Sequence, residues 1–264
     1  MDISDADGSG FQDMEINNIY FENCIHGLKK LKSESIDHFY ADPPFDIDFN
    51  KKETMYNRDN KNVIKGYTES TGTYYDFSKA WIEQCHRVLE KDGSGWICSG
   101  WSNLGDVLQA IKDSGFTIVN HIIWKYQFGV YTKKKFVTSH YHLLFVVKNP
   151  KKWTFNKDVR FRDVRTKKGN ANYRDREDVW IIDRPYQNGK EKNANTQPIE
   201  LVKKALEYTT KKGDLILDCF MGGATTAVAC IELERDYIGF EINKNLKNLQ
   251  DRRIRDANAQ KTTE

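Results

Sequence analysis

The sequence has no long apolar run and little proline. No stretch approaches the roughly 18 apolar residues of a membrane span, and no apolar signal core follows the first residues, so we expect a cytoplasmic protein without a membrane segment. Only 5 of the 264 residues are proline, whereas aromatic residues make up 12% of the chain. This composition is typical of a folded globular protein. The length suffices for one large α/β domain, or for one domain with a small insertion.

Signs of a disulfide framework or a metal site are also missing. The 5 cysteines show no paired spacing, so we expect them to be reduced, buried residues. Residues 5–15 resemble a calcium-binding loop, but the twelfth position of that loop is Ile16, where a bidentate glutamate is required. We therefore expect residues 1–14 to be a mobile polar tail, and we expect no metal site.

Positive charge is concentrated in one segment of a nearly neutral chain. The net charge is +3, yet residues 148–176 contain 11 Lys and Arg against 3 acids. Such a basic block predicts a polyanionic partner. The alternative is a solvated surface loop, because runs of charge often serve only solvation.

Short apolar runs alternate with amphipathic segments along the rest of the chain. This alternation predicts an α/β fold, with a mostly parallel sheet covered by helices on both faces. Residues 46–73 show no period and are expected to form a long loop. We expect Asp76 to cap a helix that residues 91–95 end, and Ser102 to cap the next. Strands are expected at 18–23, 36–41, 96–100, 116–124, 142–148, 178–182, 213–220 and 237–242, and further helices at 24–32, from Pro198, at 224–235 and from Asn243.

A glycine-rich turn near the C-terminus has the features of a nucleotide site. The apolar strand 215–217 ends at Asp218, and two glycines in the turn allow a ligand to approach the backbone. About twenty residues further on, a second strand ends at Glu241, where an acid binds ribose in nucleotide-binding folds. The G-x-G-x-x-G pattern is absent, and an acid stands where a diphosphate would be repelled. The turn therefore favours an adenosine that carries a cationic group.

A second element ends the strand 36–41 with Asp42, Pro43, Pro44 and Phe45. Proline fixes φ and holds the preceding residue extended, so the backbone carbonyls of this element are aimed rather than averaged. Together with 217–226 and 239–241, the element resembles the S-adenosylmethionine-dependent amino-group DNA methyltransferases. The order of the elements, with the D-P-P-F element first, the basic block second and the cofactor turn last, is similar to their β class. The resemblance implies a Rossmann-like, circularly permuted fold in a prokaryotic or phage-encoded protein.

The resemblance also implies roles for individual residues. Asp42 and the carbonyl of Pro43 would accept the two N–H bonds of a base amino group, and Phe45 would stack on the flipped-out base. No Pro-Cys nucleophile is present, which argues against methylation of cytosine C5. Ala224 replaces a family glycine, and residues 193–198 depart from the family pattern. The implied catalytic residues are Asp42, Pro43, Pro44 and Phe45, and the implied cofactor-binding residues are Asp42, Asn195, Thr196, Asp218, Phe220, Gly222, Gly223, Thr225, Thr226 and Glu241.

The basic block lies where the family carries its target-recognition region. The resulting domain prediction is a tail at 1–14, a catalytic half at 15–147, a recognition insertion at 148–178 and a cofactor half at 179–264. Double-stranded DNA is the expected partner; a cognate restriction endonuclease and a homodimer are left open. The predicted DNA contacts are Lys125, Lys133, Lys134, Lys135, Arg160, Arg162, Arg165, Lys167, Lys168 and Arg174.

We predict transfer of a methyl group to N6 of adenine, because aspartate at the first position of the D-P-P-F element is typical of adenine enzymes in the family. Methylation of cytosine N4 is the nearest alternative, since it uses the same geometry. An RNA methyltransferase and a DNA-binding module with weak catalysis are further alternatives.

Overall fold

The computed structural model describes residues 14–45, 73–127, 133–134, 136–184 and 196–261. These residues form an eight-stranded sheet in the order β1-β10-β9-β2-β3-β5-β4-β8 and a two-stranded hairpin, β6-β7. The strands are β1 (Asn18–Tyr20), β2 (Ile36–Ala41), β3 (Leu89–Ser99), β4 (Thr117–Lys125), β5 (His140–Val147), β6 (Arg165–Thr166), β7 (Gly169–Asn170), β8 (Val179–Ile181), β9 (Leu215–Asp218) and β10 (Asp236–Phe240). The helices are α1 (Cys24–Lys30), α2 (Tyr74–Val88), α3 (Leu104–Asp113), α4 (Ala171–Asp175), α5 (Ile199–Thr209), α6 (Thr225–Leu233) and α7 (Lys247–Lys261), with a 3-10 turn at Lys244–Leu246.

Most neighbouring strands of the large sheet are parallel. The exceptions are the pairs that β5 makes with β3 and β4, which are antiparallel. The chain passes from β9 through α6 to β10 on one side, and from β2 through α2 to β3 on the other. The adjacent strands β9 and β2 therefore form a topological switch point, where ligands bind beyond the carboxyl ends of the strands. The predicted mostly parallel α/β fold is confirmed.

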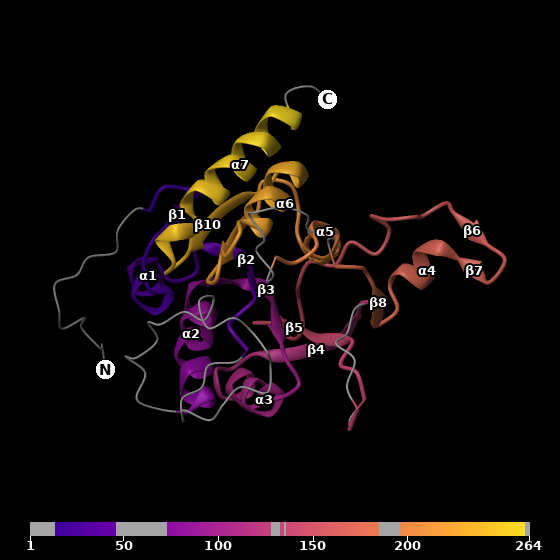
Figure 1. Cartoon of the computed structure of the whole chain (residues 1–264), viewed down its shortest axis with the longest axis horizontal. Coiled ribbons are helices and arrows are strands. Elements are labelled where there is room, and N and C mark those ends of the chain that lie inside the picture. The colour runs from indigo at the N-terminus through magenta and orange to yellow at the C-terminus, as the bar shows by residue number, and fades with distance from the viewer. Residues whose placement is uncertain (1–13, 46–72, 128–132, 135, 185–195, 262–264) are drawn as a thin grey trace.

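The sheet is buried between two layers of helices (Figure 1). Helices α1, α2 and α3 lie on one face, and α5, α6 and α7 lie on the other. Strand β2 shows how both faces are filled: Phe39 packs with Phe77 and Trp81 on the first face, whereas Tyr40 packs with Trp96 on the second. An apolar run buried on both sides is expected of a central parallel strand.

Three predicted boundaries were wrong. Thr73, not Asp76, is the N-cap of α2, and Asp76 is the third residue of a capping box. Residues 91–95 lie inside β3 instead of ending the helix. The glycine at 95 is needed for a close approach rather than a turn, because a Cβ atom there would lie 2.1 Å from the ring of Phe39. At α3 the N-cap is Asn103 rather than Ser102, and it makes no capping hydrogen bond.

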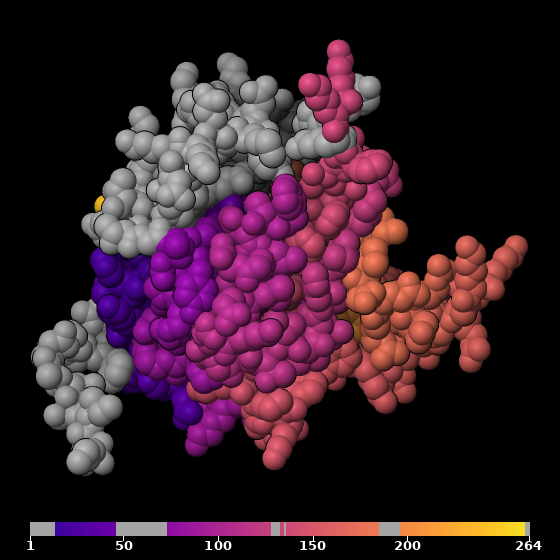
Figure 2. All heavy atoms as spheres, turned by 90° about the horizontal axis from the view of Figure 1, so that it is seen from below, coloured from indigo at the N-terminus to yellow at the C-terminus, as the bar shows by residue number. Residues whose placement is uncertain are grey.

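The hairpin β6-β7 and helix α4 project sideways from the body of the molecule (Figures 1 and 2). Both belong to the basic block, and most of the residues between 161 and 169 are exposed. Apart from Met14 and Thr73, the predicted tail at 1–14 and the predicted loop at 46–73 lie outside the described residues. In the part of the chain that the structure describes, no helix has the length and apolar character needed to cross a bilayer.

Candidate active site

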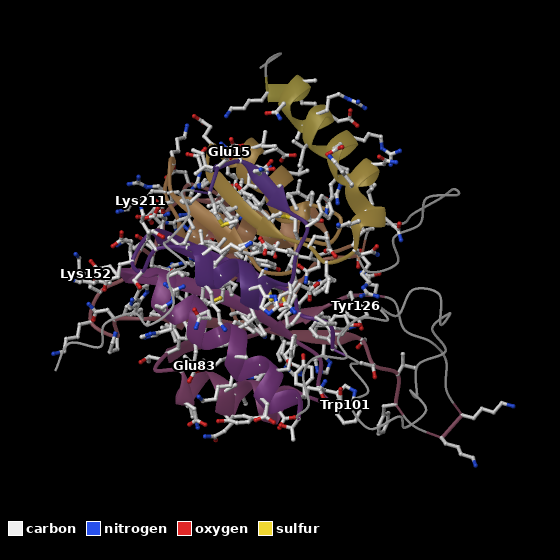
Figure 3. The ribbon with its side chains drawn as sticks, turned by 90° about the vertical axis from the view of Figure 1, so that its left-hand side faces the viewer. Glu15, Glu83, Trp101, Tyr126, Lys152 and Lys211 are labelled. Carbon is white, nitrogen blue, oxygen red and sulfur yellow. The ribbon has the colours of Figure 1, made fainter. Side chains whose placement is uncertain are left out.

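The two predicted elements meet at the carboxyl edge of the sheet. Tyr40 on β2 is paired in register with Asp218, the last residue of β9. Asp42 follows Tyr40 by two residues, so both acids stand at the switch point between adjacent parallel strands. Figure 3 shows Trp101, just beyond β3, and Tyr126, just beyond β4, on one side of the molecule, and Glu83, Lys152 and Lys211 on the opposite side. Trp101, two residues beyond β3, is 56% exposed.

Three other elements hold the D-P-P-F element. The hydroxyl of Tyr74 on α2 donates to the carbonyl of Pro44 across 3.1 Å, and the side-chain amide of Asn103 donates to the carbonyl of Phe45. The ring of Phe45 lies 5.2 Å from that of Tyr141 on β5, centroid to centroid. These contacts fix the backbone that follows Asp42, and Phe45 is half-buried.

The turn from β9 to α6 has a buried acid at its base. The backbone N–H of Phe220 donates to Oδ1 of Asp218 across 2.8 Å. Burial raises the pKa of Asp218 to about 7, although hydrogen bonds from Thr226 and Phe220 oppose that shift. Two positions in the turn have left-handed φ values, 49° at Gly222 and 63° at Ala224. A left-handed conformation costs a non-glycine residue such as alanine about 1–2 kcal/mol, so Ala224 marks a strained backbone at the site.

Glu241, just after β10, holds the same turn from the other side. The backbone N–H of Gly222 donates to its Oε2 across 2.8 Å, and that of Asn243 donates to its Oε1 across 2.7 Å. Burial raises the pKa of Glu241, and hydrogen bonds from the backbones of Asn243, Gly222 and Ile242 act in the opposite direction. A carboxylate has about four acceptor positions, so Glu241 can still receive a ligand hydroxyl while it fixes the turn.

Helix α7 braces the glycine turn, a role that the sequence did not indicate. The side chain of Gln250 donates to the carbonyl of Gly222 across 2.7 Å. The guanidinium of Arg253 donates to the carbonyl of Gly223 and, across 3.1 Å, to the hydroxyl of Thr225. The charged C-terminal helix is therefore part of the support of the site.

A buried network links the two halves of the site and was also missed. The hydroxyl of Tyr40 donates to Oε1 of Gln197 across 2.7 Å, and the Nε2 atom of Gln197 donates to Sγ of Cys98 across 3.3 Å. Gln197 follows Thr196 directly, which places that predicted cofactor residue next to β2. Asn195 lies outside the described residues. The remaining predicted cofactor residues, from Asp218 to Glu241, surround the β9–α6 turn.

Comparison with known proteins agrees with the geometry of the site. Residues 36–251 match the DNA methylase family, which comprises the N6 and N4 amino methyltransferases. The chain belongs to this family. It is therefore an S-adenosylmethionine-dependent DNA methyltransferase of the amino-group class, which confirms the predicted resemblance, enzyme class and cofactor.

Relatives of this methyltransferase include bacterial enzymes of similar length. The Type II methyltransferase M2.MboI of Moraxella bovis is 30% identical over 244 residues, which are 89% of this chain and 86% of the relative. The DNA adenine methyltransferase YhdJ of Escherichia coli is 32% identical over 255 residues, 88% of this chain and 82% of the relative. The crystal structure of the M1.HpyAVI–SAM complex has a TM-score of 0.62 at 20% identity, covering 90% of this chain and 98% of that one. The cytosine-N4-specific PvuII methyltransferase has a TM-score of 0.65 at 15% identity, covering 90% and 92%.

The structure sorts the predicted DNA contacts of the methyltransferase into three groups. Lys125 is half-buried, and its ammonium donates to the carbonyl of Tyr126 across 3.0 Å. Lys135 lies outside the described residues. The residues with exposed side chains are Lys133, Lys134, Arg162, Arg165, Lys167, Lys168 and Arg174.

Arg160 corrects the prediction, because its guanidinium is already used within the protein. The side chain is 13% exposed and pairs with Asp175 at 3.0 Å and with Glu200 and Glu207 at 2.5 Å. Lys204 also pairs with Asp175, at 3.0 Å. These ion pairs attach the basic block to α5. Arg160 therefore anchors the block, and a phosphate contact from its guanidinium would require these ion pairs to open.

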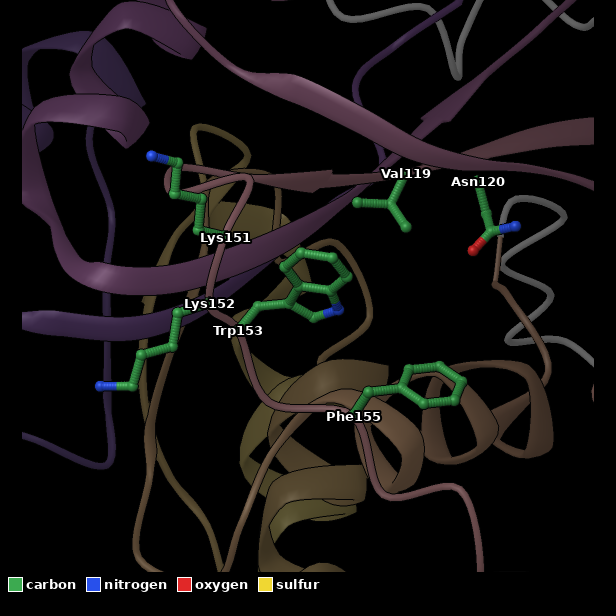
Figure 4. Close-up of a pocket in the computed structure, with 6 residues that line it drawn as sticks. All are labelled: Val119, Asn120, Lys151, Lys152, Trp153 and Phe155. Carbon is green, nitrogen blue, oxygen red and sulfur yellow. The ribbon is translucent and has the colours of Figure 1, made fainter.

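A hollow of about 510 Å³ lies away from the D-P-P-F element and the glycine turn (Figure 4). It is lined by Val119 and Asn120 on β4 and by the segment 151–155, including Trp153 and Phe155. The lining residues of β4 belong to its amino end, and the D-P-P-F element follows a carboxyl end, so the hollow lies at the other edge of the sheet. Among the described residues, no group of three His, Cys, Asp or Glu side chains could hold a metal ion.

Proposed function

We propose that this methyltransferase acts on N6 of adenine in duplex DNA and that Asp42 is its central catalytic residue. The observation that carries the proposal is the register of β2 and β9, in which Tyr40, two residues before Asp42, is paired with the buried acid Asp218; it supports a site shared by the two acids. The E. coli relative named a DNA adenine methyltransferase supports the choice of adenine. The family also includes N4 enzymes, so methylation of cytosine N4 is the second candidate.

The residues of the turn fit S-adenosylmethionine. A buried acid whose pKa is raised to about 7 gains from a neighbouring positive charge, and Glu241 has acceptor positions for ribose hydroxyls. The same two acids would repel a diphosphate. The bound cofactor supplies a methyl group on a positively charged sulfur. We assign its binding to Asp218 and Glu241, together with the turn residues Phe220, Gly222, Gly223, Thr225 and Thr226, and to Thr196 and Asn195.

The role of the D-P-P-F element follows from the chemistry of an exocyclic amino group. Its nitrogen is a poor nucleophile because the lone pair is delocalised into the ring. Acceptors on both N–H bonds, the carboxylate of Asp42 and the carbonyl of Pro43, favour a tetrahedral nitrogen that can attack. Pro44 stiffens the backbone, and Phe45 offers a π-face, which is worth about 1–3 kcal/mol per stacked base. With the cofactor bound, the nitrogen would form its bond to the methyl carbon as the carbon–sulfur bond breaks, the sulfur would leave as a neutral thioether, and the extra amino proton would pass to water.

For DNA binding we assign the exposed basic side chains of the block 148–178 and the segment around Lys133 and Lys134. A basic, projecting two-stranded hairpin suits contact with a groove and its phosphates. Lys125 and Lys135 remain part of this proposal. Relatives named Type II methyltransferases support a role beside a cognate restriction endonuclease in the cytoplasm; a homodimer also remains a proposal.

The decisive experiment is expression in a host that lacks endogenous adenine methylation, followed by nucleoside analysis of its DNA. N6-methyladenine is expected, and N4-methylcytosine would favour the second candidate. The Asp42→Ala variant removes the side-chain acceptor and should lose activity by about 100-fold or more, with DNA binding retained. An active variant would remove Asp42 from its catalytic role, and DNA without modified bases would contradict the proposed function.

A further inference from the structure

An unassigned cluster of aromatic rings continues from Phe45 along the carboxyl edge of the sheet. The ring of Tyr141 lies 5.2 Å from that of Phe45 and 5.5 Å from that of Tyr126. Trp124 lies 5.7 Å from Tyr141 and 5.6 Å from Tyr126. The four rings therefore form one contiguous cluster, which we call the aromatic platform. Trp124 and Tyr126 are buried in it, and its half-buried end is Phe45, the ring assigned to the target base.

The guanidinium of Arg184 lies over three of the four rings of this platform. The guanidinium carbon of Arg184 lies 4.9 Å from the ring centroid of Tyr126, 5.3 Å from that of Tyr141 and 5.9 Å from that of Trp124. Planar guanidinium groups stack on aromatic faces as nucleobases do. Because Tyr141 contacts both Arg184 and Phe45, only this ring separates the guanidinium from Phe45 along the platform.

The position of Arg184 follows from how β8 ends. Strand β8 runs parallel to β4, with Lys125 opposite Ile181. Beyond it, the N–H of Ile182 donates to the carbonyl of Lys125 across 3.1 Å, and the indole of Trp124 donates to the carbonyl of Ile182 across 2.8 Å. Arg184 therefore emerges at the carboxyl edge, where Asp42 and Asp218 also lie.

One polar atom of Arg184 lacks a partner in the part of the chain that the structure describes. Its Nε atom is buried and has no hydrogen-bond partner among the described residues. No carboxylate of those residues forms an ion pair with its guanidinium. An unsatisfied buried donor is costly, so an acceptor supplied by a ligand would stabilise this arrangement.

We propose that Arg184 is a target-base contact: the flipped base lies on the Phe45 end of the aromatic platform, with the guanidinium of Arg184 against it. The guanidinium would lie on the platform next to the base, in the plane of the base. It would donate N–H bonds to the ring nitrogens, which are acceptors in adenine. Arg184 would thus hold the base while Asp42 receives its amino group. This inference rests on the proposed function, because it requires a base outside the helix.

The test uses 2-aminopurine at the methylated position, once that position has been mapped by sequencing DNA from expressing cells. Base flipping raises the fluorescence of this analogue. The parent is expected to give the full rise, whereas Arg184→Ala should give little and should lower kcat/KM for DNA by about 10-fold or more, the range of one stacking interaction. Arg184→Lys keeps the charge but not the planar stack, and it should fail in the same way.

Controls separate this role from other effects. Arg255→Ala removes an arginine from α7 that is exposed and lies far along the chain from the platform, and it should behave as the parent. The thermal midpoint and the affinity for S-adenosylmethionine should change little in Arg184→Ala, so that a loss cannot come from unfolding. On DNA with an abasic target, parent and Arg184→Ala should bind equally.

Several outcomes would overturn the inference. They are a normal fluorescence rise in Arg184→Ala, full rescue by lysine, and an equal loss of affinity on abasic DNA, which would move the contact to a phosphate. If the parent modifies no DNA, the proposed function fails first and the inference fails with it. If the parent is active and Arg184→Ala matches it, only the inference fails.

Discussion

The hydroxyl of Tyr40 and the side-chain amide of Gln197 are joined across 2.7 Å, although 157 residues separate them in the chain. Tyr40 is 1% exposed, and its pKa is raised well above its usual value, first by burial and then by the thiol of Cys98. The tyrosine is therefore neutral and acts as a donor. Because Tyr40 lies two residues before Asp42, this bond connects the catalytic strand with the segment that leads into α5.

We expect Gln197→Ala to lower the free energy of unfolding by about 1–3 kcal/mol, since a buried hydroxyl would lose its acceptor. Urea denaturation measures this change. Activity should fall as well, through kcat rather than through KM for DNA, because the backbone that carries Asp42 would be held less firmly.

Tyr75→Phe is the matched control for this pair. It removes the hydroxyl that donates to Asp113 across 2.6 Å on the surface, where such a bond contributes little. Equal stability of the parent and Gln197→Ala would show that the Tyr40 hydroxyl finds another acceptor and that the network has no structural weight.

Asp218 predicts a dependence of stability on pH. Its pKa is raised from 3.8 to about 7 by burial, so the folded state holds this proton more tightly than the unfolded state. The stability that this group contributes is fully present below pH of about 4 and is lost as the pH rises to about 7. Asp218→Asn cannot ionise, and the difference in unfolding free energy between parent and variant should therefore change across this window.

The same ionisation should control cofactor affinity with the opposite sign. The ionised carboxylate attracts a cation, so S-adenosylmethionine should bind more tightly as the pH rises through about 7. S-adenosylhomocysteine lacks the positive sulfur and should show a weaker trend in calorimetry. Identical pH profiles for the two compounds and for Asp218→Asn would mean that Asp218 does not sense the ligand charge.

Glu241→Gln should weaken S-adenosylmethionine binding by about 10-fold or more, with DNA affinity little changed. Both carboxylate oxygens accept backbone N–H bonds, so an amide NH₂ group would face a donor in either orientation. Glu232→Gln, which alters a half-exposed acid of α6 paired with Lys203 at 2.8 Å, is the control. An unaltered cofactor affinity would show that Glu241 does not bind the cofactor and only follows the strand.

The sequence was sufficient for the parts of the site that adjoin strand ends. Asp42, Asp218 and Glu241 each follow an apolar run, and the alternation of strands and helices brings parallel strand ends to one edge. Residues 91–95 were misassigned because glycine in a strand serves close packing as well as turns. Only the packing against Phe39 reveals which use applies.

The missed residues depend on contacts between segments that are distant in sequence. The role of Gln197 depends on its hydrogen bond with Tyr40, and the position of Arg184 depends on the pairing of β8 with β4. Local periodicity in the sequence reveals neither contact. Composition likewise could not separate Arg160 from Arg162. The difference lies in carboxylates from α4 and α5, which fold against Arg160 alone.

That distinction gives the last prediction. Replacing Arg162, Arg165 and Lys168 together with alanine should flatten the dependence of DNA affinity on salt, by about 0.9 in the logarithmic slope for each phosphate that is no longer neutralised. Arg160→Ala should leave the slope unchanged and lower stability instead, because three carboxylates would lose their shared partner. Binding titrations between about 50 and 200 mM salt measure the slope, and thermal denaturation measures the second effect. Should the triple variant keep the slope and activity of the parent, the exposed arginines and lysine are solvated surface. Should Arg160→Ala alone flatten the slope without loss of stability, its ion pairs must open when DNA binds, and the anchoring role assigned to it would be wrong.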